Sequence, residues 1–228
     1  MDPAYLASTA ALDSDHPSVR DFARRHCDGA NDERERARRL FYAVRDGIRY
    51  NPFGTPPTLE DMKASTTLAR GESFCIPKAM LLTASARAVG IPARLGFADV
   101  RNHLTSDRLR AIMKSDLFVF HGYTELWLGG RWVKATPTFN LSLCQKTGVR
   151  TLEFDGEHDS LLQPFDNAGG RHMEYVRDRG TFADLDLPRI LEAWIEAYGS
   201  DFGSTMSGAT RSHDAAEFER EAKAESKA

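Results

Sequence analysis

"GESFCIPKAMLLTASARAVGIPAR", residues Gly71–Arg94, is the stretch that decides the fold. From Cys75 onward, small and apolar side chains recur at intervals of three and four residues, which is the spacing of one face of a helix. Gly90 and Pro92 end this pattern, as glycine and proline commonly do after a helix. The spacing therefore predicts a helix with a cysteine in its first turn and a stripe facing the core: Cys75, Ala79, Leu82, Ala86 and Val89.

The predicted position of Cys75 suits a nucleophile. At the first turn of a helix, unpaired backbone N–H groups and the positive end of the helix dipole lower the pKa of a thiol. The same N–H groups can stabilise the oxyanion that forms when a thiolate attacks a carbonyl. A free cysteine is also commonly a small buried side chain with no chemistry. On position alone, both interpretations of Cys75 stay open.

A β-hairpin is predicted in "LFVFHGYTELWLGGRWVKATPTFN", residues Leu117–Asn140. Two runs rich in aromatic and β-branched residues flank Gly129-Gly130, a pair typical of a two-residue turn. This turn fixes a register that brings two tryptophans together and sets a carboxylate opposite an ammonium. The predicted pairs are Leu128 with Arg131, Trp127 with Trp132, Glu125 with Lys134, and Tyr123 with Thr136.

His121 lies on the first strand of this hairpin. Alternation along a strand puts it on one face with Val119 and Tyr123, and the register makes Thr136 its diagonal neighbour. An imidazole there can act as the general base that takes the proton of a cysteine nucleophile. Like Cys75, a single histidine can equally be structural.

The rest of the chain predicts an α+β architecture. Helical spacing predicts helices at residues 17–27, 31–50 and 186–199. A strand is predicted at 93–100, directly after the helix that begins at Cys75, and residues 153–170 are predicted to form an acidic, turn-rich surface loop. Beyond about Gly203 too few apolar residues remain to dock on a core. Helices followed by strands predict one domain over residues 1–203, with a flexible tail over 204–228.

Composition excludes several classes of function. The formal net charge of -3, from 30 basic and 33 acidic side chains, predicts neither a nucleic-acid nor a membrane partner. No basic start precedes an apolar stretch, and no window of about 18 apolar residues occurs, so the sequence predicts a cytoplasmic protein. The three cysteines form no C-x-x-C pair and the histidines lack ligand spacing, so neither a disulfide framework nor a metal site is predicted.

Three blocks together resemble the transglutaminase-like superfamily of papain-like cysteine enzymes. They read "SFCIPKAMLLTASARAVGIPAR", "HGYTELWLGGRW" and "WVKATPTFN", in the order and spacing of the family, within residues 15–140. The resemblance implies a papain-like fold, with N-terminal helices packed on an antiparallel β-sheet. It also implies that Cys75 is the nucleophile and His121 the base.

One position departs from the family pattern. Where the family carries the aspartate of V-D-P-T, this sequence has Thr136, whose hydroxyl can accept a hydrogen bond but cannot stabilise an imidazolium by charge. Three explanations stay open. Asn140, or a carboxylate from the loop at 155–159, orients His121 instead; a hydroxyl suffices for an undemanding substrate; or catalysis has been lost and the pocket kept.

The predicted function is attack of the Cys75 thiolate on an amide or ester carbonyl, through an acyl-thioester. The resemblance favours hydrolysis, as a peptidase or amidase, over transfer to an amine. The expected substrate is a peptide, a protein or a small amide, and no cofactor is expected. The alternative is a weakened or inactive module that binds a peptide or protein partner in the same cleft, which Thr136 favours. Substrate identity and oligomeric state stay open.

Overall fold

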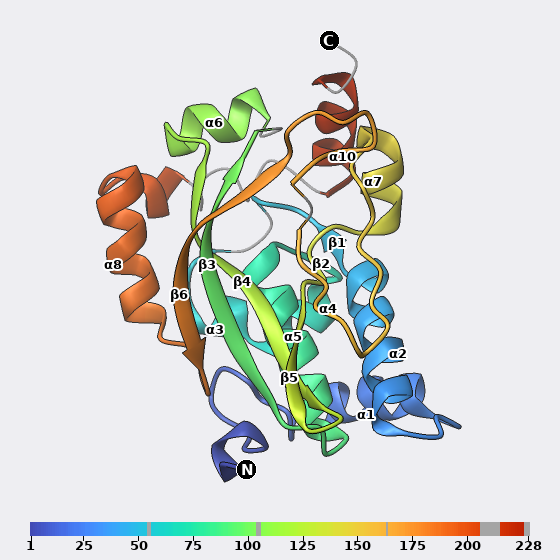
Figure 1. The fold of residues 1–228 in the computed structure, drawn as a ribbon. Coiled ribbons are helices and arrows are strands. Elements are labelled where there is room, and N and C mark those ends of the chain that lie inside the picture. The colour runs from blue at the N-terminus through green and yellow to red at the C-terminus, as the bar shows by residue number, and fades with distance from the viewer. Residues whose placement is uncertain (54–55, 104–105, 163, 206–214, 226–228) are drawn as a thin grey trace.

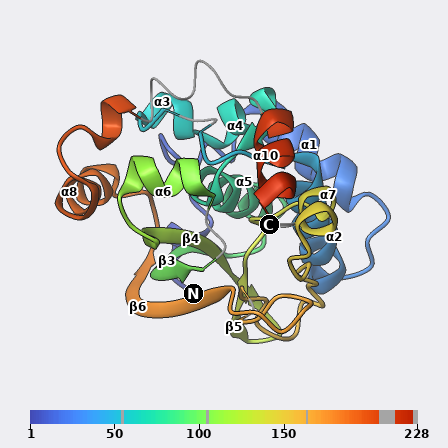
Figure 2. The same cartoon turned by 90° about the horizontal axis from the view of Figure 1, so that it is seen from above.

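The computed structural model describes residues 1–53, 56–103, 106–162, 164–205 and 215–225, and it shows the α+β fold predicted from the sequence. A four-stranded antiparallel sheet, in the order β5-β4-β3-β6, carries helices on one face (Figures 1 and 2). A short parallel pair, β1-β2, lies apart from it. The strands are β1 (Arg49–Tyr50), β2 (Glu72–Ser73), β3 (Ala93–Asn102), β4 (Leu117–Leu128), β5 (Arg131–Ala135) and β6 (Met173–Phe182).

The helices include both predicted N-terminal ones and the predicted helix near residue 190. None of the helices in the described residues is long and apolar enough to cross a membrane. The helices include the short 3-10 helix η1 (Pro3–Tyr5), α1 (Pro17–Cys27), α2 (Glu33–Gly47), α3 (Leu59–Met62), α4 (Ala64–Arg70), α5 (Cys75–Ala88), α6 (Asp107–Met113), α7 (Leu141–Thr147), α8 (Leu187–Tyr198) and α10 (Ala215–Glu225).

Helix α5 is the centre of the fold and is buried on every side rather than on one stripe. Every residue from Cys75 to Arg87 is buried, because α1, α2, α4 and strand β4 all pack against this helix. Its side chains are mostly small or apolar all around, which is typical of an enclosed helix. Some of the few polar ones are bonded internally: the Thr83 hydroxyl, for example, donates to Thr124 Oγ1 at 3.2 Å.

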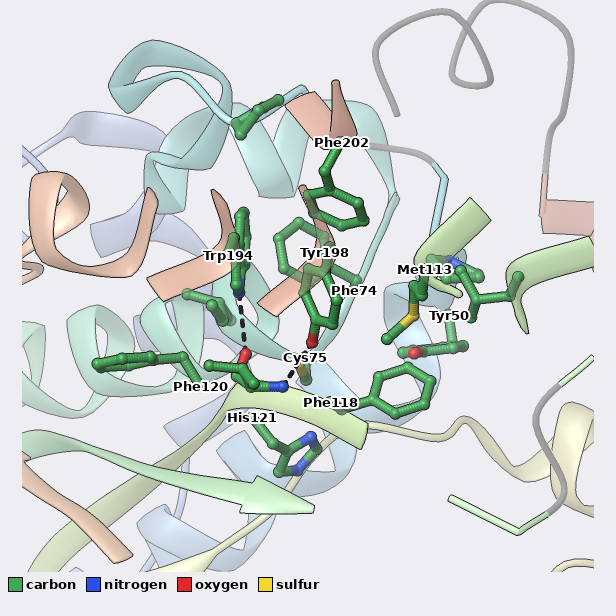
Figure 3. Close-up of a pocket in the computed structure, with 15 residues that line it drawn as sticks. Tyr50, Phe74, Cys75, Met113, Phe118, Phe120, His121, Trp194, Tyr198 and Phe202 are labelled. Carbon is green, nitrogen blue, oxygen red and sulfur yellow. Dashed lines mark hydrogen bonds between the residues drawn. The ribbon is translucent and has the colours of Figure 1, made fainter. Parts of the chain in front are cut away.

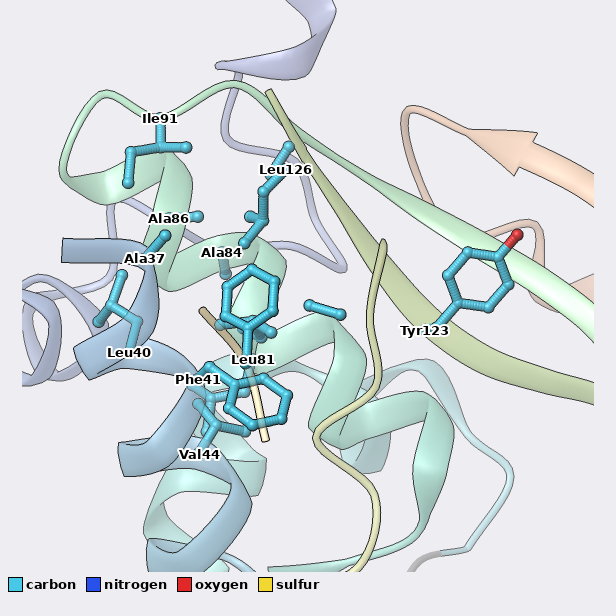
Figure 4. Close-up of a cluster of buried hydrophobic side chains, with 14 of the residues drawn as sticks. Ala37, Leu40, Phe41, Val44, Leu81, Ala84, Ala86, Ile91, Tyr123 and Leu126 are labelled. Atoms are coloured by element: carbon cyan, nitrogen blue, oxygen red, sulfur yellow. The ribbon is translucent and has the colours of Figure 1, made fainter. Parts of the chain in front are cut away.

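The contact between α2 and α5 forms the first hydrophobic core (Figure 4). Leu40, Phe41 and Val44 of α2 belong to one buried cluster with Leu81 of α5. Helix α2 begins at the predicted place, since the Asp32 carboxylate accepts a hydrogen bond from the Glu35 N–H at 2.8 Å. The predicted apolar spacing of this helix is confirmed.

The β4-β5 hairpin has the predicted register in all five of its pairs, from Leu128↔Arg131 at the turn to Thr124↔Ala135. Both turn glycines have positive φ, 58° at Gly129 and 83° at Gly130, as a two-residue hairpin turn of this type requires. The two paired tryptophans, Trp127 and Trp132, meet edge to face with ring centroids 5.4 Å apart.

Two details of the hairpin differ from the prediction. The Glu125 carboxylate bonds to Arg94 of β3 at 2.7 Å, and the ammonium of Lys134 lies over the Tyr123 ring instead. The ladder also ends one pair early, at Thr124↔Ala135, because the Thr136 N–H donates to the carbonyl of Ser160. The hairpin register alone did not predict the contacts with Arg94, Tyr123 and Ser160.

The C-terminal third differs most from the prediction. Strand β6 extends the sheet at one edge, although its polar sequence showed no alternation. Residues 215–225, predicted as part of a flexible tail, form α10. A sparse helical spacing explains this helix, because Ala215, Phe218 and Glu219 are all buried and the Phe218 ring lies 5.8 Å from that of Tyr50.

Gly96 of β3 is predicted to be irreplaceable on steric grounds. A Cβ at this position would lie 2.2 Å from Cε2 of Tyr123, so Gly96→Ala should lower the free energy of unfolding by about 1–3 kcal/mol. Gly47→Ala is the matched control, because its Cβ would meet nothing within 4 Å and alanine favours the helix. Urea denaturation measures both, and equal stability of the two variants would contradict the steric argument.

Candidate active site

Cys75 is the first residue of α5, and its side chain lines a cavity at the end of that helix (Figure 3). The preceding residue, Phe74, caps the helix without a side-chain hydrogen bond. The β1-β2 pair holds Tyr50 beside Ser73, two residues before the thiol. The helix N-terminus therefore offers its backbone N–H groups to whatever binds next to Cys75.

The pKa of the Cys75 thiol differs from the sequence-based expectation. Burial raises the pKa of Cys75 to about 11, whereas the backbone N–H groups of Gly122, Ile76 and Cys75 itself act to lower it. The prediction of a lowered pKa was therefore wrong for the resting site, since desolvation outweighs the helix terminus. Cys75 rests as a neutral thiol, with donors already directed at its sulfur.

His121, on β4, lines the same cavity as Cys75. Burial lowers the pKa of His121 to about 4, so the imidazole is neutral at physiological pH. Among the described residues, its buried Nε2 has no hydrogen-bond partner, and no bond joins the ring to Cys75. A general base must be unprotonated to accept a proton, so the neutral imidazole of His121 is in the state that this role needs.

A β-bulge precedes His121. Ala98 of β3 pairs with His121, but Val100 pairs with Phe118, so β4 holds one extra residue at this point. Phe120 has φ 60°, a left-handed conformation that is rare for a bulky residue. The bulge interrupts the alternation that predicted Val119 and His121 on one face.

A buried ion pair braces the bulge. The Asp99 carboxylate accepts a hydrogen bond from the Phe120 N–H at 3.1 Å. The Asp99 carboxylate also accepts hydrogen bonds from Nε and Nη2 of Arg179, from β6, at 2.8 and 2.7 Å. The Arg179 guanidinium in turn lies over the Phe120 ring. The strained residue next to His121 is thus held by β3 and β6 together, a support that the sequence did not reveal.

Thr136, at the place of the family's aspartate, is fully buried, and within the described residues its hydroxyl makes no hydrogen bond of ordinary geometry. The Tyr175 hydroxyl, from β6, lies in the same region, where burial raises its pKa to about 12 and the Thr136 hydroxyl acts to lower it. That tyrosine also accepts a hydrogen bond from the Leu162 N–H at 3.3 Å. An uncharged pair of hydroxyls therefore occupies the region of the missing acid.

Asn140 does not bond to His121. Its Oδ1 accepts a hydrogen bond from the Tyr50 N–H at 2.9 Å, and its Nδ2 donates to Ser142 Oγ at 2.7 Å. The acidic loop is also engaged elsewhere: Asp155 binds His158 at 2.7 Å, and Asp159 accepts from the Lys134 N–H at 2.9 Å. The structure thus places both of these substitutes for the aspartate in other interactions.

Tyr50 is a site residue that the sequence did not single out. It lines the cavity with Cys75, and burial, followed by the proximity of Cys75, raises the pKa of its hydroxyl well above the ordinary range. Within the described part of the chain that hydroxyl has no hydrogen-bond partner, so it is available to donate to a bound oxygen.

The described residues contain no group of three or more side chains suited to hold a metal ion.

A family comparison agrees with this arrangement. Residues 20–137, more than half of the chain, match the model of the transglutaminase-like superfamily. The chain belongs to the transglutaminase-like superfamily. In this transglutaminase-like chain, the matched residues include Cys75, His121 and Thr136. A search of curated proteins gave no match.

A solved structure shows the same fold. A protein from Cytophaga hutchinsonii, described as a "putative cysteine protease", superposes with a TM-score of 0.51 at 16% sequence identity. The match covers 82% of this transglutaminase-like chain and 48% of the Cytophaga protein, so this chain spans about half the length of that protein. At this identity the likeness extends to the fold alone.

Gly122 is predicted to set the distance between β4 and the start of α5. A Cβ on Gly122 would lie 3.0 Å from the Ile76 backbone Cα, so Gly122→Ala must shift the strand by a few tenths of an ångström. Since a displacement of about 1 Å in a catalytic site can cost about 10²-fold, we expect the acylation rate of Cys75 to fall about tenfold. Rapid-mixing kinetics measure this rate, with Gly47→Ala as control; an unchanged rate would show that the spacing is not critical.

Proposed function

We propose that this protein is a cysteine hydrolase that attacks an amide or ester carbonyl with Cys75 and releases the acyl group to water. The observation that carries the proposal is the common cavity wall of Cys75, at a helix N-terminus, and His121, held neutral by burial. A thiol, a base and directed N–H donors are the minimum set for nucleophilic catalysis on a carbonyl.

The proposed reaction begins from a neutral thiol and a neutral imidazole. As Sγ of Cys75 bonds to the carbonyl carbon, His121 takes the thiol proton. The backbone N–H groups at the start of α5 and the Tyr50 hydroxyl supply donors for the oxyanion. His121 then gives its proton to the departing amine or alcohol as the carbon–nitrogen or carbon–oxygen bond breaks. Water, deprotonated by His121, resolves the acyl-thioester and regenerates the thiol.

The proposed substrates are peptides or small amides, and acyl transfer to an amine is the variant of the same reaction in which an amine replaces water. The description of the Cytophaga protein as a "putative cysteine protease" adds support for hydrolysis. A second candidate function is a binding module that no longer catalyses. The observation that favours it is the fully buried Thr136, which supplies no charge for an imidazolium.

The test uses an internal control that the chain provides. Cys144 is also buried, and burial raises its pKa to about 11, as it does for Cys75. The protein is mixed with p-nitrophenyl acetate at pH 7.5, and peptide mass spectrometry follows acetylation of each cysteine. We expect Cys75 to be acetylated at least 10²-fold faster than Cys144, with continuing p-nitrophenolate release that Cys75→Ala abolishes. Equal rates at the two thiols would reject the hydrolase and favour the binding module.

A further inference from the structure

The cavity beside Cys75 is almost entirely aromatic and aliphatic (Figure 3). It has a volume of about 70 Å³ and is walled by β4, α6, α8 and the segments before α3 and α5. Among the described residues, no charged side chain lines this cavity. Apart from Cys75 and the neutral His121, its only polar side-chain groups are tyrosine hydroxyls and the indole N–H of Trp194. The main wall residues are Phe74, Met113, Phe118, Phe120, Trp194 and Tyr198.

The polar ends of the α8 aromatics are already used by the protein. The indole N–H of Trp194 donates to the Val119 carbonyl at 2.9 Å. The Tyr198 hydroxyl accepts a hydrogen bond from the Val119 N–H at 2.6 Å and donates to the Leu117 carbonyl at 2.9 Å. These bonds join α8 to the edge of the bulge in β4 and leave carbon surface facing the cavity, which disfavours any charged or strongly hydrated group there.

A second cavity next to it offers the opposite chemistry. It has a volume of about 360 Å³, shares Tyr50, Leu109 and Phe118 with the first, and is lined further on by polar groups such as Asp107 and His103. A polar part of a substrate therefore has a place to go that is not the cavity of Cys75. The small apolar cavity is left for the group that stays attached to the sulfur through the acyl-thioester.

We propose that the acyl group of the substrate is small, aliphatic and uncharged. This inference rests on the proposed function and names the substrate class of the same site. The size follows from the volume, because a cavity of about 150 Å³ accommodates a benzene ring and this one is about half as large. The neutrality follows from the wall, where burial of aliphatic surface is favourable and a charge finds no partner.

An isosteric pair of esters tests the proposal. In p-nitrophenyl 3,3-dimethylbutanoate and p-nitrophenyl trimethylammonioacetate the acyl groups have one shape and differ by a charge. Acylation forms the Sγ–carbonyl bond, breaks the bond to p-nitrophenolate and leaves the thiol proton on His121. Each rate is divided by that with N-acetylcysteine to remove intrinsic reactivity. We expect at least a tenfold preference for the neutral ester; no preference, or a preference for the cation through the aromatic walls, would overturn the proposal.

A substitution in the wall checks where the preference arises. Met113, at the end of α6, lines the cavity and takes no part in the proposed chemistry. Met113→Glu should reverse the preference towards the trimethylammonio ester, because its carboxylate faces the cation. Met113→Leu should keep the preference of the natural protein. If Met113→Glu leaves the ratio unchanged, the acyl group does not occupy this cavity.

Binding without reaction separates this inference from the proposed function. In Cys75→Ala protein with Trp127→Phe and Trp132→Phe, Trp194 is the one remaining tryptophan of the three in the chain. Titration with 3,3-dimethylbutanamide should change its fluorescence at a concentration at least tenfold lower than titration with trimethylammonioacetamide. This result together with an unreactive Cys75 would keep the pocket and reject the hydrolase. Equal affinities together with a reactive Cys75 would reject the pocket and keep the hydrolase.

Discussion

Replacing His121 with alanine is expected to lower the acetylation rate of Cys75 by about 10²–10⁴-fold, the range that a general base supplies. With a pKa of about 11, Cys75 is almost entirely protonated at neutral pH, so its attack depends on a base at hand. His121 is neutral above its pKa of about 4, so in the natural protein the rate should rise with pH through about 4 and change little up to neutral pH. Stopped-flow measurement of p-nitrophenolate release gives both the rate and the pH profile.

The control for this prediction separates lost chemistry from lost packing. His121→Asn keeps a planar polar side chain in the cavity wall but supplies no base, so it should be nearly as slow as His121→Ala. In both variants the acid limb near pH 4 should vanish, and the rate should follow the Cys75 thiolate, rising tenfold per pH unit. A variant that keeps the natural rate and the acid limb would mean that another group is the base.

Replacing Thr136 with aspartate is expected to raise the acylation rate by about ten- to 10³-fold. A carboxylate near an imidazole stabilises the imidazolium that forms as the thiol proton is transferred, a stabilisation that the present hydroxyl cannot give. The same charge should raise the pKa of His121 from about 4 by about 1–3 units. The acid limb of the pH profile should then move to higher pH by that amount, because the base is lost below its own pKa.

Two variants make the Thr136→Asp result interpretable. Thr136→Asn matches aspartate in size without the charge and should leave the acid limb at pH 4. Thr136→Val removes the hydroxyl and keeps the volume, so any loss of rate measures what the hydroxyl contributes to positioning His121. If Thr136→Asp folds, as judged by its circular dichroism, and moves neither the rate nor the acid limb, position 136 does not act on His121.

The fold, the start of α5 at Cys75 and the hairpin that carries His121 could be predicted because their signals are local. The spacing from Cys75 marked a helix start, and the Gly129-Gly130 turn fixed the register that the structure has near it. The protonation state of Cys75 could not be predicted in the same way. The residues around Cys75 indicate the start of a helix. The burial that raises the pKa of the Cys75 thiol comes instead from β4 and β1, which are distant from Cys75 in the sequence.

The surroundings of His121 were hidden for a related reason. Period-2 alternation assumes a regular strand, and nothing in "FVFHG" announces that Phe120 adopts a left-handed conformation. That conformation depends on Asp99 of a neighbouring strand and, through it, on Arg179 of β6. Tyr175 was hidden because the edge strand that carries it has no apolar alternation. Contacts between segments that are distant in the sequence cannot be read from the local spacing of apolar and polar residues.

Helix α10 has a consequence for comparing sequences of this kind. Its Glu219 carboxylate, almost fully buried, binds Lys146, the Asn140 amide at 3.4 Å and Arg49 at 3.4 Å. Through Asn140 it is one step from the backbone of Tyr50, on the wall of the cleft. A substitution or deletion in α10 would not be visible in an alignment of the three sequence blocks that mark the family. Through Asn140 and Tyr50 it would nonetheless affect the wall of the cavity that contains Cys75.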